Sequence, residues 1–149
     1  LINDVIVTVR KLSSNLRPGI LDDLGLAAAI EWQSEEFKKR TGFKCDVVCE
    51  EIPLLSEEKA VALFRILQES LTNIIKHSNA DSVKISLVRK GDNIEMIIKD
   101  NGQGFSSETL TNRGSYGIIG MRERVKFFNG TLDITGAEDG VSVHVMIPV

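Results

Sequence analysis

The sequence predicts an α+β protein in which helices cover one face of a mixed, mainly antiparallel β-sheet. Three observations support this two-layer α/β sandwich. Helical and strand-like apolar spacings occur in separate blocks of the chain, without the regular alternation of a parallel fold. Two pairs of strand-like segments are each joined by a short turn, which indicates antiparallel hairpins. The length of 149 residues and the 42% hydrophobic content fit one globular domain.

Composition and charge narrow the classes of function. The formal net charge of −3 shows no excess of positive charge that could bind a nucleic acid, so we expect no direct nucleic-acid binding. No apolar run approaches the roughly 18 residues that a membrane-spanning helix needs, and no signal-peptide pattern is present. The chain begins with Leu1 rather than Met, so we expect it to be part of a longer protein.

Two helices are predicted before the first strand. Residues 1–16 carry a helical apolar stripe, formed by Val5, Val9, Leu12 and Leu16. Pro18 and Gly19 end this helix and form the only natural boundary in the chain. The stretch LGLAAAIEWQSEEFKKRTG, residues 24–42, predicts a second helix that ends at Gly42. Its apolar side is formed by Leu26, Ile30 and Phe37.

The stretch KCDVVCE, residues 44–50, predicts a short strand that carries both cysteines. In a strand the Cα atoms of Cys45 and Cys49 lie about 13 Å apart. A disulfide needs a Cα separation below about 7 Å, so both cysteines are expected to be free, as is usual in the cytosol. No further ligands are spaced to join them in a metal site.

A long helix is predicted to follow Ser56, whose hydroxyl is suited to cap it. Glu57 and Glu58 fall in its first turn, where the helix dipole favours negative charge. Its apolar face is predicted to consist of Phe64, Leu67, Leu71, Ile74 and Ile75.

The remaining elements are two hairpins and a helix. Residues 82–89 and 93–100 alternate apolar and polar side chains around a turn at Lys90-Gly91-Asp92, which predicts the first hairpin. The stretch MRERVKFFNG, residues 121–130, predicts a helix that ends at Gly130. The second hairpin is predicted from TLDIT and VSVHVMIPV, with its turn at Asp139-Gly140.

The stretch KDNGQGF places a carboxylate and two glycines at the end of a predicted strand. Asp100 can accept hydrogen bonds from an amine, and Gly102 and Gly104 allow a ligand to approach the backbone closely. Asp-Asn-Gly is also common in ordinary turns, so this motif alone leaves a plain loop equally open.

The stretch GSYGIIGMRERV leads through three glycines into a predicted helix. Gly114, Gly117 and Gly120 at a helix N-terminus suit phosphate binding, because free N–H groups and the helix dipole favour an anion. No Gly-Lys-Ser or Gly-Lys-Thr follows, and the context is not a parallel βαβ unit, so neither the Walker nor the dinucleotide motif applies. A surface loop remains open, and the polar residues 106–115 are a candidate lid.

The stretch LQESLTNIIKHSNA, residues 67–80, carries an unusual polar face. Glu69, Asn73 and His77 are four residues apart on one side of the helix, and Lys76 lies beside them. A magnesium-bound triphosphate needs an oxygen ligand to the metal and a cation near the phosphates. Asn73 can supply the first and Lys76 the second, while Glu69 can orient or activate an attacking group. Taken singly, each residue fits a solvated helix face.

Together, these three stretches resemble the N box and the two glycine boxes of the ATP-binding domain of sensor histidine kinases. The similarity is greatest to the subgroup of the nitrate/nitrite sensors and the membrane-fluidity thermosensor. The segment LRPGILDDLGL also resembles that subgroup's passage from the dimerising helical hairpin into the ATP-binding domain. The motifs occur in the order of the family and span nearly the whole chain.

The resemblance implies a Bergerat-type site for ATP and Mg²⁺. Asp100 would accept from the adenine amino group, with Gly102 and Gly104 shaping that pocket. Asn73 would hold magnesium, Glu69 would act at the transferred phosphate, and Lys76 and His77 would lie near the phosphates. The glycines Gly114, Gly117 and Gly120 would belong to the lid and the helix N-terminus. Val141 stands where a threonine is common, which puts one polar contact in doubt.

The resemblance also implies a relay from ATP to a histidine and then to the aspartate of a response-regulator receiver domain. Neither His77 nor His144 has the acceptor pattern, so the acceptor is expected upstream of Leu1. Residues 1–17 would be a remnant of the second hairpin helix, through which the whole protein forms a homodimer, and residues 18–149 the catalytic domain. The domain is expected in the cytoplasm, whether or not the whole sensor is anchored in a membrane.

Two other functions remain open. An anti-sigma-type serine kinase shares this fold, but the segment LRPGILDDLGL argues against it. A degenerate module that binds partners and no nucleotide is the other alternative. The retained Glu69, Asn73, Asp100 and glycines argue against that module.

Overall fold

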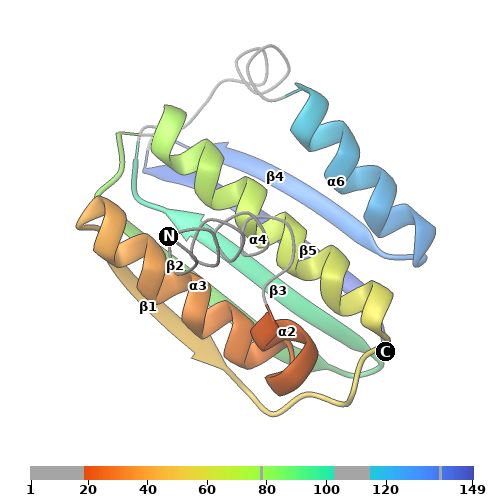
Figure 1. Ribbon diagram of the computed structural model, residues 1–149. Helices are drawn as coiled ribbons and strands as arrows, with labels where there is room; N and C mark the ends of the chain where they lie inside the picture. Colours follow the sequence, from red (N-terminus) through yellow and green to blue (C-terminus); the bar gives the residue numbers. More distant parts are fainter. Residues whose placement is uncertain (1–18, 78, 103–114, 138) are drawn as a thin grey trace, which may run out of the picture.

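The computed structural model describes residues 19–77, 79–102, 115–137 and 139–149. The helix expected over residues 1–16 lies outside them. In chain order the elements are α2 (Gly19–Leu24), α3 (Leu26–Thr41), β1 (Lys44–Cys49), α4 (Glu57–His77), β2 (Ser82–Lys90), β3 (Asn93–Asp100), α6 (Ser115–Phe127), β4 (Thr131–Ala137) and β5 (Gly140–Pro148) (Figure 1). Their arrangement confirms the predicted α+β sandwich.

The sheet has five strands in the order β1-β2-β3-β5-β4. β1 pairs with β2 in parallel, and α4 forms the crossover that a parallel pair requires. The other three pairings are antiparallel, including the two predicted hairpins β2–β3 and β4–β5. The last strand, β5, therefore lies inside the sheet, between β3 and β4.

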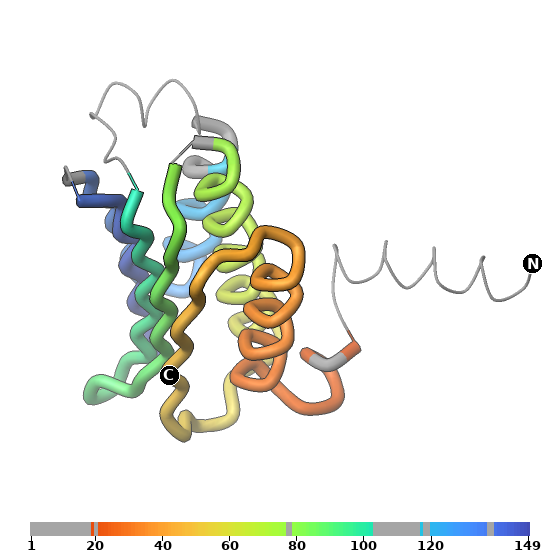
Figure 2. The backbone as a smooth tube through the Cα atoms, turned by 90° about the vertical axis from the view of Figure 1, so that its left-hand side faces the viewer, coloured from red at the N-terminus to blue at the C-terminus, as the bar shows by residue number. Residues whose placement is uncertain are grey.

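The helices α3, α4 and α6 cover one face of the sheet, as the turned view makes clear (Figure 2). α4 lies in the middle, between α3 and α6 (Figure 1). The C-terminal ends of α4 and β3 and the N-terminal end of α6 lie at the same end of the molecule. The predicted site residues come from these ends, so the fold gathers them at one end of the sandwich.

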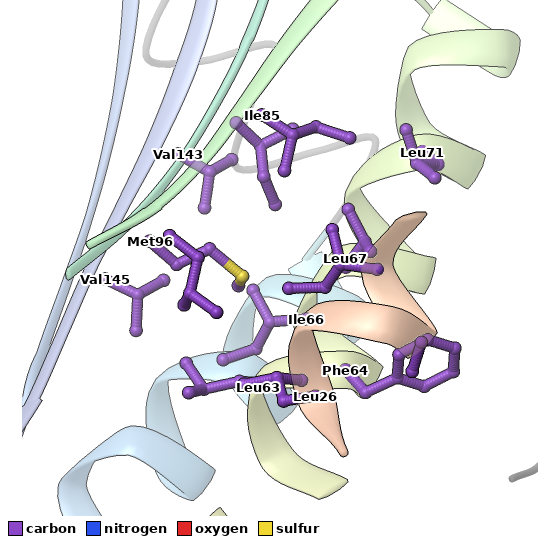
Figure 3. Packing of buried hydrophobic residues seen from close by; sticks show 14 of the residues in the cluster. Leu26, Leu63, Phe64, Ile66, Leu67, Leu71, Ile85, Met96, Val143 and Val145 are labelled. Carbon is purple, nitrogen blue, oxygen red and sulfur yellow. The ribbon is translucent and has the colours of Figure 1, made fainter. Parts of the chain in front are cut away.

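The core fills the space between α4 and the sheet (Figure 3). Leu63, Ile66 and Leu67 of α4 are fully buried, and so are Met96 and Val145 on the facing strands. Burial of this apolar surface is the main stabilising term of the fold. The predicted apolar side of α3 is confirmed, because Leu26, Ile30 and Phe37 are all buried.

Local signals fix several ends of elements. Ser56 caps α4 as predicted, since its Oγ accepts a hydrogen bond from the Lys59 N–H at 3.3 Å. Gly42 ends α3 in the left-handed conformation, with φ 74°, that glycine adopts without strain. Both cysteines are free, as the strand spacing predicted.

Four expectations about the elements need correction. The segment after Pro18 forms the short helix α2, which was not predicted. α6 begins at Ser115, six residues before the expected Met121, because its first turns pack against α4. Ile75 is 50% exposed and lies outside the core, since the helix turns it away from the sheet. The second turn falls one residue early, because Ala137 pairs with Gly140.

Candidate nucleotide-binding site

Asp100 is a buried carboxylate at the C-terminal end of β3, with only 3% of its surface exposed. Its Oδ1 accepts hydrogen bonds from the backbone N–H of Gly102 at 2.9 Å and of Val141 at 3.3 Å. Both of these donors reach the same oxygen, so the hydrogen bonds orient the carboxyl group without using Oδ2. A carboxylate fixed in this way is suited to accept a hydrogen bond from an amine of a ligand.

The turn before β5 approaches Asp100 so closely that only glycine fits there. Gly140 has φ +136°, and a Cβ at this position would collide with the Asp100 carbonyl oxygen. The close approach is what brings the Val141 N–H to Asp100 Oδ1. The sequence identified Asp100 and Gly102, but it did not identify this contribution of β5.

Burial has a direct electrostatic effect on Asp100. Desolvation raises the pKa of its carboxyl group above the ordinary value, and the hydrogen bonds from Gly102 and Val141 offset only part of this effect. Keeping the Asp100 carboxyl group ionised therefore costs free energy. A hydrogen-bond donor from a ligand would reduce that cost. Perturbed carboxyl groups of this kind are typical of binding sites.

The polar residues of α4 lie at the same end of the molecule. Glu69 and Asn73 are half-buried and Lys76 is exposed. The four-residue spacing places Glu69 and Asn73 on adjacent turns of one helix face. His77 belongs to α4, but its side chain lies outside the described residues. The structure therefore provides an amide, a carboxylate and an ammonium group along one helix edge.

α6 packs on this edge of α4 through a glycine. A Cβ on Gly117 would collide with the carboxylate of Glu69, so glycine is needed for this contact of α6 with Glu69. Gly120 is exposed one turn later, with nothing within 4 Å of its Cβ position. Both glycines belong to α6 itself and do not precede it, contrary to the predicted boundary. Gly104 and Gly114 lie outside the described residues.

A groove of about 640 Å³ runs over the outer side of α4, between α3 and α6. It brings together Glu69, Lys76, Gly117 and Gly120 from the predicted set. Asn73, Asp100 and Gly102 do not line this groove. The predicted residues thus divide into a group at the strand ends and a group at the groove, with α4 between them.

The described residues contain no group of three or more His, Cys, Asp or Glu side chains that could hold a metal by themselves. A magnesium ion held here would need oxygen ligands from a bound phosphate chain as well as the Asn73 amide. This is the usual arrangement for Mg²⁺, which keeps few protein ligands and binds with substrate phosphates.

A polar cluster that sequence reasoning missed lies on the uncovered face of the sheet. Glu95 on β3 is buried, and its Oε2 contacts His144 Nε2 at 2.7 Å and Lys90 Nζ at 3.2 Å. Burial alone would raise the pKa of Glu95, but the hydrogen bonds from His144 and Lys90 outweigh it and lower that pKa. The alternation of β3 placed Glu95 on this face, but its partners depend on the pairing of β3 with β5.

Comparison with known proteins gives a consistent picture. Residues 58–149 match the family described as histidine kinase-, DNA gyrase B- and HSP90-like ATPases. The chain is 34% identical over 150 residues to the sensor histidine kinase MctS of Rhizobium johnstonii, covering 99% of this chain and 32% of that protein. It is 35% identical over 154 residues to the histidine-protein kinase/phosphatase DegS of Brevibacillus brevis, covering all of this chain and 39% of that protein.

Solved structures show the same fold. The histidine kinase domain of the blue-light activated kinase EL346 from Erythrobacter litoralis superposes with a TM-score of 0.72 at 22% identity. That comparison covers 83% of this chain and 60% of the other. The chain spans less than two fifths of the length of MctS and of DegS, so most of each of those proteins has no counterpart in it.

Proposed function

Because this chain belongs to the family of histidine kinase-, DNA gyrase B- and HSP90-like ATPases, we propose that residues 18–149 are the catalytic, ATP-binding domain of a sensor histidine kinase. In the whole protein this domain transfers the γ-phosphoryl group of ATP to a histidine. The aspartate of a response-regulator receiver domain then takes the phosphoryl group. The chain's similarity to MctS and DegS over nearly its full length supports this proposal.

The observation that carries the proposal is the fixed carboxyl group of Asp100. It is buried at the end of β3, and two backbone N–H groups hold it through Oδ1 alone. This geometry fits an acceptor for the exocyclic amine of adenine. The base then lies at the strand ends, and the phosphates extend along the polar edge of α4.

The residues of α4 would bind and orient the triphosphate. Asn73 offers an amide oxygen to the magnesium ion, and Lys76 offers positive charge to the phosphates. Glu69, which lies beside Gly117 of α6, would orient the attacking group at the transferred phosphorus. Positioning and charge stabilisation supply most of the catalysis in phosphoryl transfer, and the proposal assigns these tasks to the three side chains.

The phosphorylated histidine belongs to another part of the protein in this proposal. His144 is 39% exposed, and its Nε2 is engaged with the Glu95 carboxylate on the uncovered face of the sheet. His77 is the last residue of α4, and the proposal assigns it to the phosphate end of the nucleotide site. Residues 1–17 then belong to the dimerising hairpin that carries the acceptor and forms the homodimer.

The proposal places this domain in the cytoplasm, where ATP and response regulators are found. None of the described helices is both long and apolar enough to cross a membrane. An anchor elsewhere in the whole sensor is compatible with this placement.

The test is calorimetric titration with a non-hydrolysable ATP analogue, with and without Mg²⁺. Asp100→Ala should abolish binding, because the base loses its acceptor. Asn73→Ala should weaken binding chiefly in the presence of Mg²⁺, since its role is at the metal. Asp46→Ala is the matched control for Asp100→Ala, because it removes an exposed carboxylate from β1, the edge strand of the sheet that is farther from β3 and β5 than from β2.

Each alternative predicts a different result. A folded wild type that binds no nucleotide would support the interaction module and refute the proposal. Nucleotide binding together with transfer to serine of a partner protein would support the anti-sigma-type kinase. Transfer to a histidine in the intact protein would establish the proposed reaction.

A further inference from the structure

Ser70 carries a buried hydroxyl group that the proposed site does not yet use. It lies in the middle of α4 and is 2% exposed. Among the buried side-chain nitrogen and oxygen atoms of the described residues, its Oγ alone has no hydrogen-bond partner. An unsatisfied hydroxyl in a protein interior costs free energy, so its presence needs an explanation.

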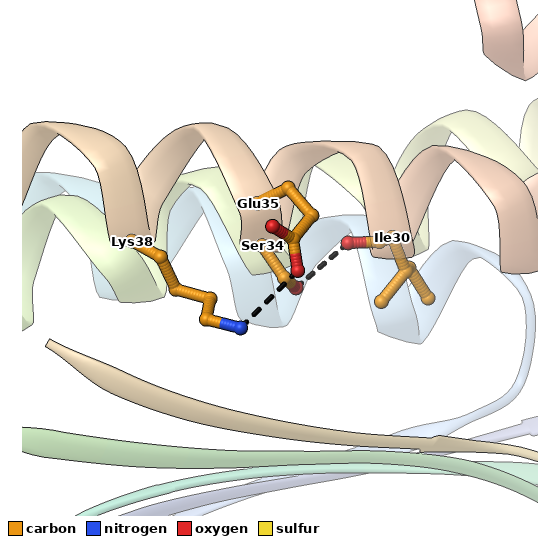
Figure 4. A network of polar contacts seen from close by, with 4 residues as sticks. All are labelled: Ile30, Ser34, Glu35 and Lys38. Carbon is orange, nitrogen blue, oxygen red and sulfur yellow. Dashed lines mark hydrogen bonds and ion pairs between the residues drawn. The ribbon is translucent and has the colours of Figure 1, made fainter.

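Three other helical hydroxyls in the described part of the chain behave differently. Ser34 donates to the Ile30 carbonyl at 2.7 Å, as seen along α3 (Figure 4). Thr41 and Thr72 likewise donate to the carbonyl one turn before them, at 2.7 and 2.9 Å. This local bond is the usual solution for a hydroxyl inside a helix. Ser70 does not make it, so its hydroxyl remains available for another partner.

The position of Ser70 relates it to both ends of the proposed nucleotide site. It precedes Asn73 by three residues, so the two side chains lie on the same side of α4. Its neighbour Leu71 lies at the end of the core where Ile85 and Val143 are found (Figure 3). Ile98 pairs with both of those strand residues, which places them in one row across the sheet.

Asp100 lies in the next row of the same sheet face. It follows Ile98 by two residues, and it pairs with Val83 on β2. Val141 completes this row from β5 through its hydrogen bond to Asp100 Oδ1. Ser70 follows Ile66 by four residues and Leu63 by seven, and these two side chains point from α4 toward the sheet (Figure 3). Ser70 is therefore on the sheet-facing side of α4, one row below the carboxylate proposed to accept from the base.

The chemistry of the base requires a donor beside this carboxylate. The edge of adenine that carries the amino group also carries a ring nitrogen, N1, that accepts a hydrogen bond. An ionised carboxylate only accepts, so Asp100 can serve the amine and not N1. A serine hydroxyl can donate, and rotation about its single χ1 bond can redirect Oγ from the interior toward the base.

We propose that Ser70 is a base-specificity residue, whose hydroxyl donates to the N1 nitrogen of adenine while Asp100 accepts from the amino group. This inference rests on the proposed ATP-binding function. Together the two residues select adenine against guanine, which presents an oxygen acceptor and an N1–H donor at the corresponding positions. The bound base also supplies the partner that the buried hydroxyl lacks in the free protein.

The test combines Ser70→Ala with an altered ligand. Wild type and variant are titrated with ADP and with 1-deaza-ADP, in which a C–H group replaces N1. Ser70→Ala should weaken ADP binding about 2- to 12-fold, the range expected for one hydrogen bond. Wild type should lose a similar factor with 1-deaza-ADP, whereas Ser70→Ala should show no further loss with that ligand.

Thermal unfolding of the free protein gives an independent readout. Ser70→Ala removes an unsatisfied hydroxyl, so the midpoint of the free protein should rise while affinity for ADP falls. The matched control is Ser34→Ala, which removes a buried hydroxyl that has a partner. That variant should lower the midpoint and leave ADP affinity unchanged. A purely structural Ser70 would not produce opposite changes in stability and affinity.

Two results would overturn the inference while leaving the proposed function intact. One is equal ADP affinity of Ser70→Ala and wild type. The other is a full loss with 1-deaza-ADP on Ser70→Ala, which would mean that N1 has a different partner. A folded wild type that does not bind ADP would refute both this inference and the proposed function.

Discussion

The contact between α6 and Glu69 leads to a sharp prediction for Gly117→Ala. The new methyl carbon would lie 2.9 Å from Glu69 Cδ and 3.3 Å from Cγ, and it would collide with Oε1. Comfortable contacts between carbon atoms begin near 3.5 Å, so the carboxylate must move by roughly 1 Å. Glu69 is half-buried at the end of a flexible side chain, so this movement is possible without unfolding the helix.

The expected result is a loss of phosphoryl transfer without a comparable loss of stability. Replacing a helical glycine with alanine favours the helix by up to about 1 kcal/mol, which offsets the displaced Glu69 contacts. The free energy of unfolding should therefore change by less than about 1 kcal/mol. A misplacement of about 1 Å at a reacting centre lowers the rate roughly 100-fold. Rates are measured as histidine phosphorylation in the intact kinase.

Gly120→Ala is the stability control for this prediction. It adds the same methyl group one turn later in α6, where nothing lies within 4 Å. The unfolding midpoint should rise by about 1–4 °C, from a gain of about 0.5–1 kcal/mol. Normal histidine phosphorylation by Gly117→Ala would refute the argument that this glycine is needed to position Glu69. A large loss of stability in Gly120→Ala would show that α6 is packed differently.

Three further outcomes follow from the geometry. Gly140→Ala should destabilise the fold by more than about 2 kcal/mol in denaturant titrations, because φ +136° strains alanine and its Cβ meets the Asp100 carbonyl; an unchanged midpoint would contradict this. Leu67→Ala should lower the free energy of unfolding by about 2–5 kcal/mol and Ile75→Ala by about 0.5 kcal/mol, since only Leu67 is fully buried. Equal losses of stability in denaturant titrations would place Ile75 in the core. The pKa of Glu95 is lowered in the folded state. Its contribution to the stability of the fold is therefore present above the ordinary glutamate pKa and is lost as the pH falls through the folded-state pKa. Denaturant unfolding of wild type and Glu95→Gln is measured at neutral and at acidic pH. The difference between their free energies of unfolding should shrink in acid, and a constant difference would argue against the ion pair.

The fold class was accessible from the sequence because its signals are local. The alternation of β2 and β3, the turn at Gly91 and the cap at Ser56 each act within a few residues, and each is confirmed. The first residue of α6 could not be predicted from such local signals. Glycine is a poor helix former, so Gly117 favoured a loop, whereas the structure places it inside α6, which packs against α4, β4 and β5.

Ile75 illustrates a second limit. Ile74 and Ile75 are adjacent, so a helical pattern cannot assign both to the same narrow face, and the structure buries Ile74 and exposes Ile75. α2 was missed for a related reason. Proline beside glycine was interpreted as a helix end, although proline also occurs commonly at the first positions of helices.

The candidate site could be predicted only residue by residue. The motifs identified Asp100 and Gly102, and the structure joins them by a hydrogen bond. The N–H donor of Val141 is 41 residues away in the chain, so it became visible only through the strand order. The hydroxyl of Ser70 belongs to the same category, because no sequence pattern reveals that a buried donor lacks a partner.

The position of β5 has a consequence for the order of synthesis. This strand emerges from the ribosome after the other four strands, yet it must insert between β3 and β4 to complete the sheet. Until residue 141 is available, β3 and β4 expose unpaired edges, and Asp100 lacks one of its two backbone donors. A chain stalled before β5 would therefore be prone to aggregate and unable to hold the carboxylate in place. Nucleotide, as a ligand of the completed fold alone, would then stabilise only chains in which β5 is in place.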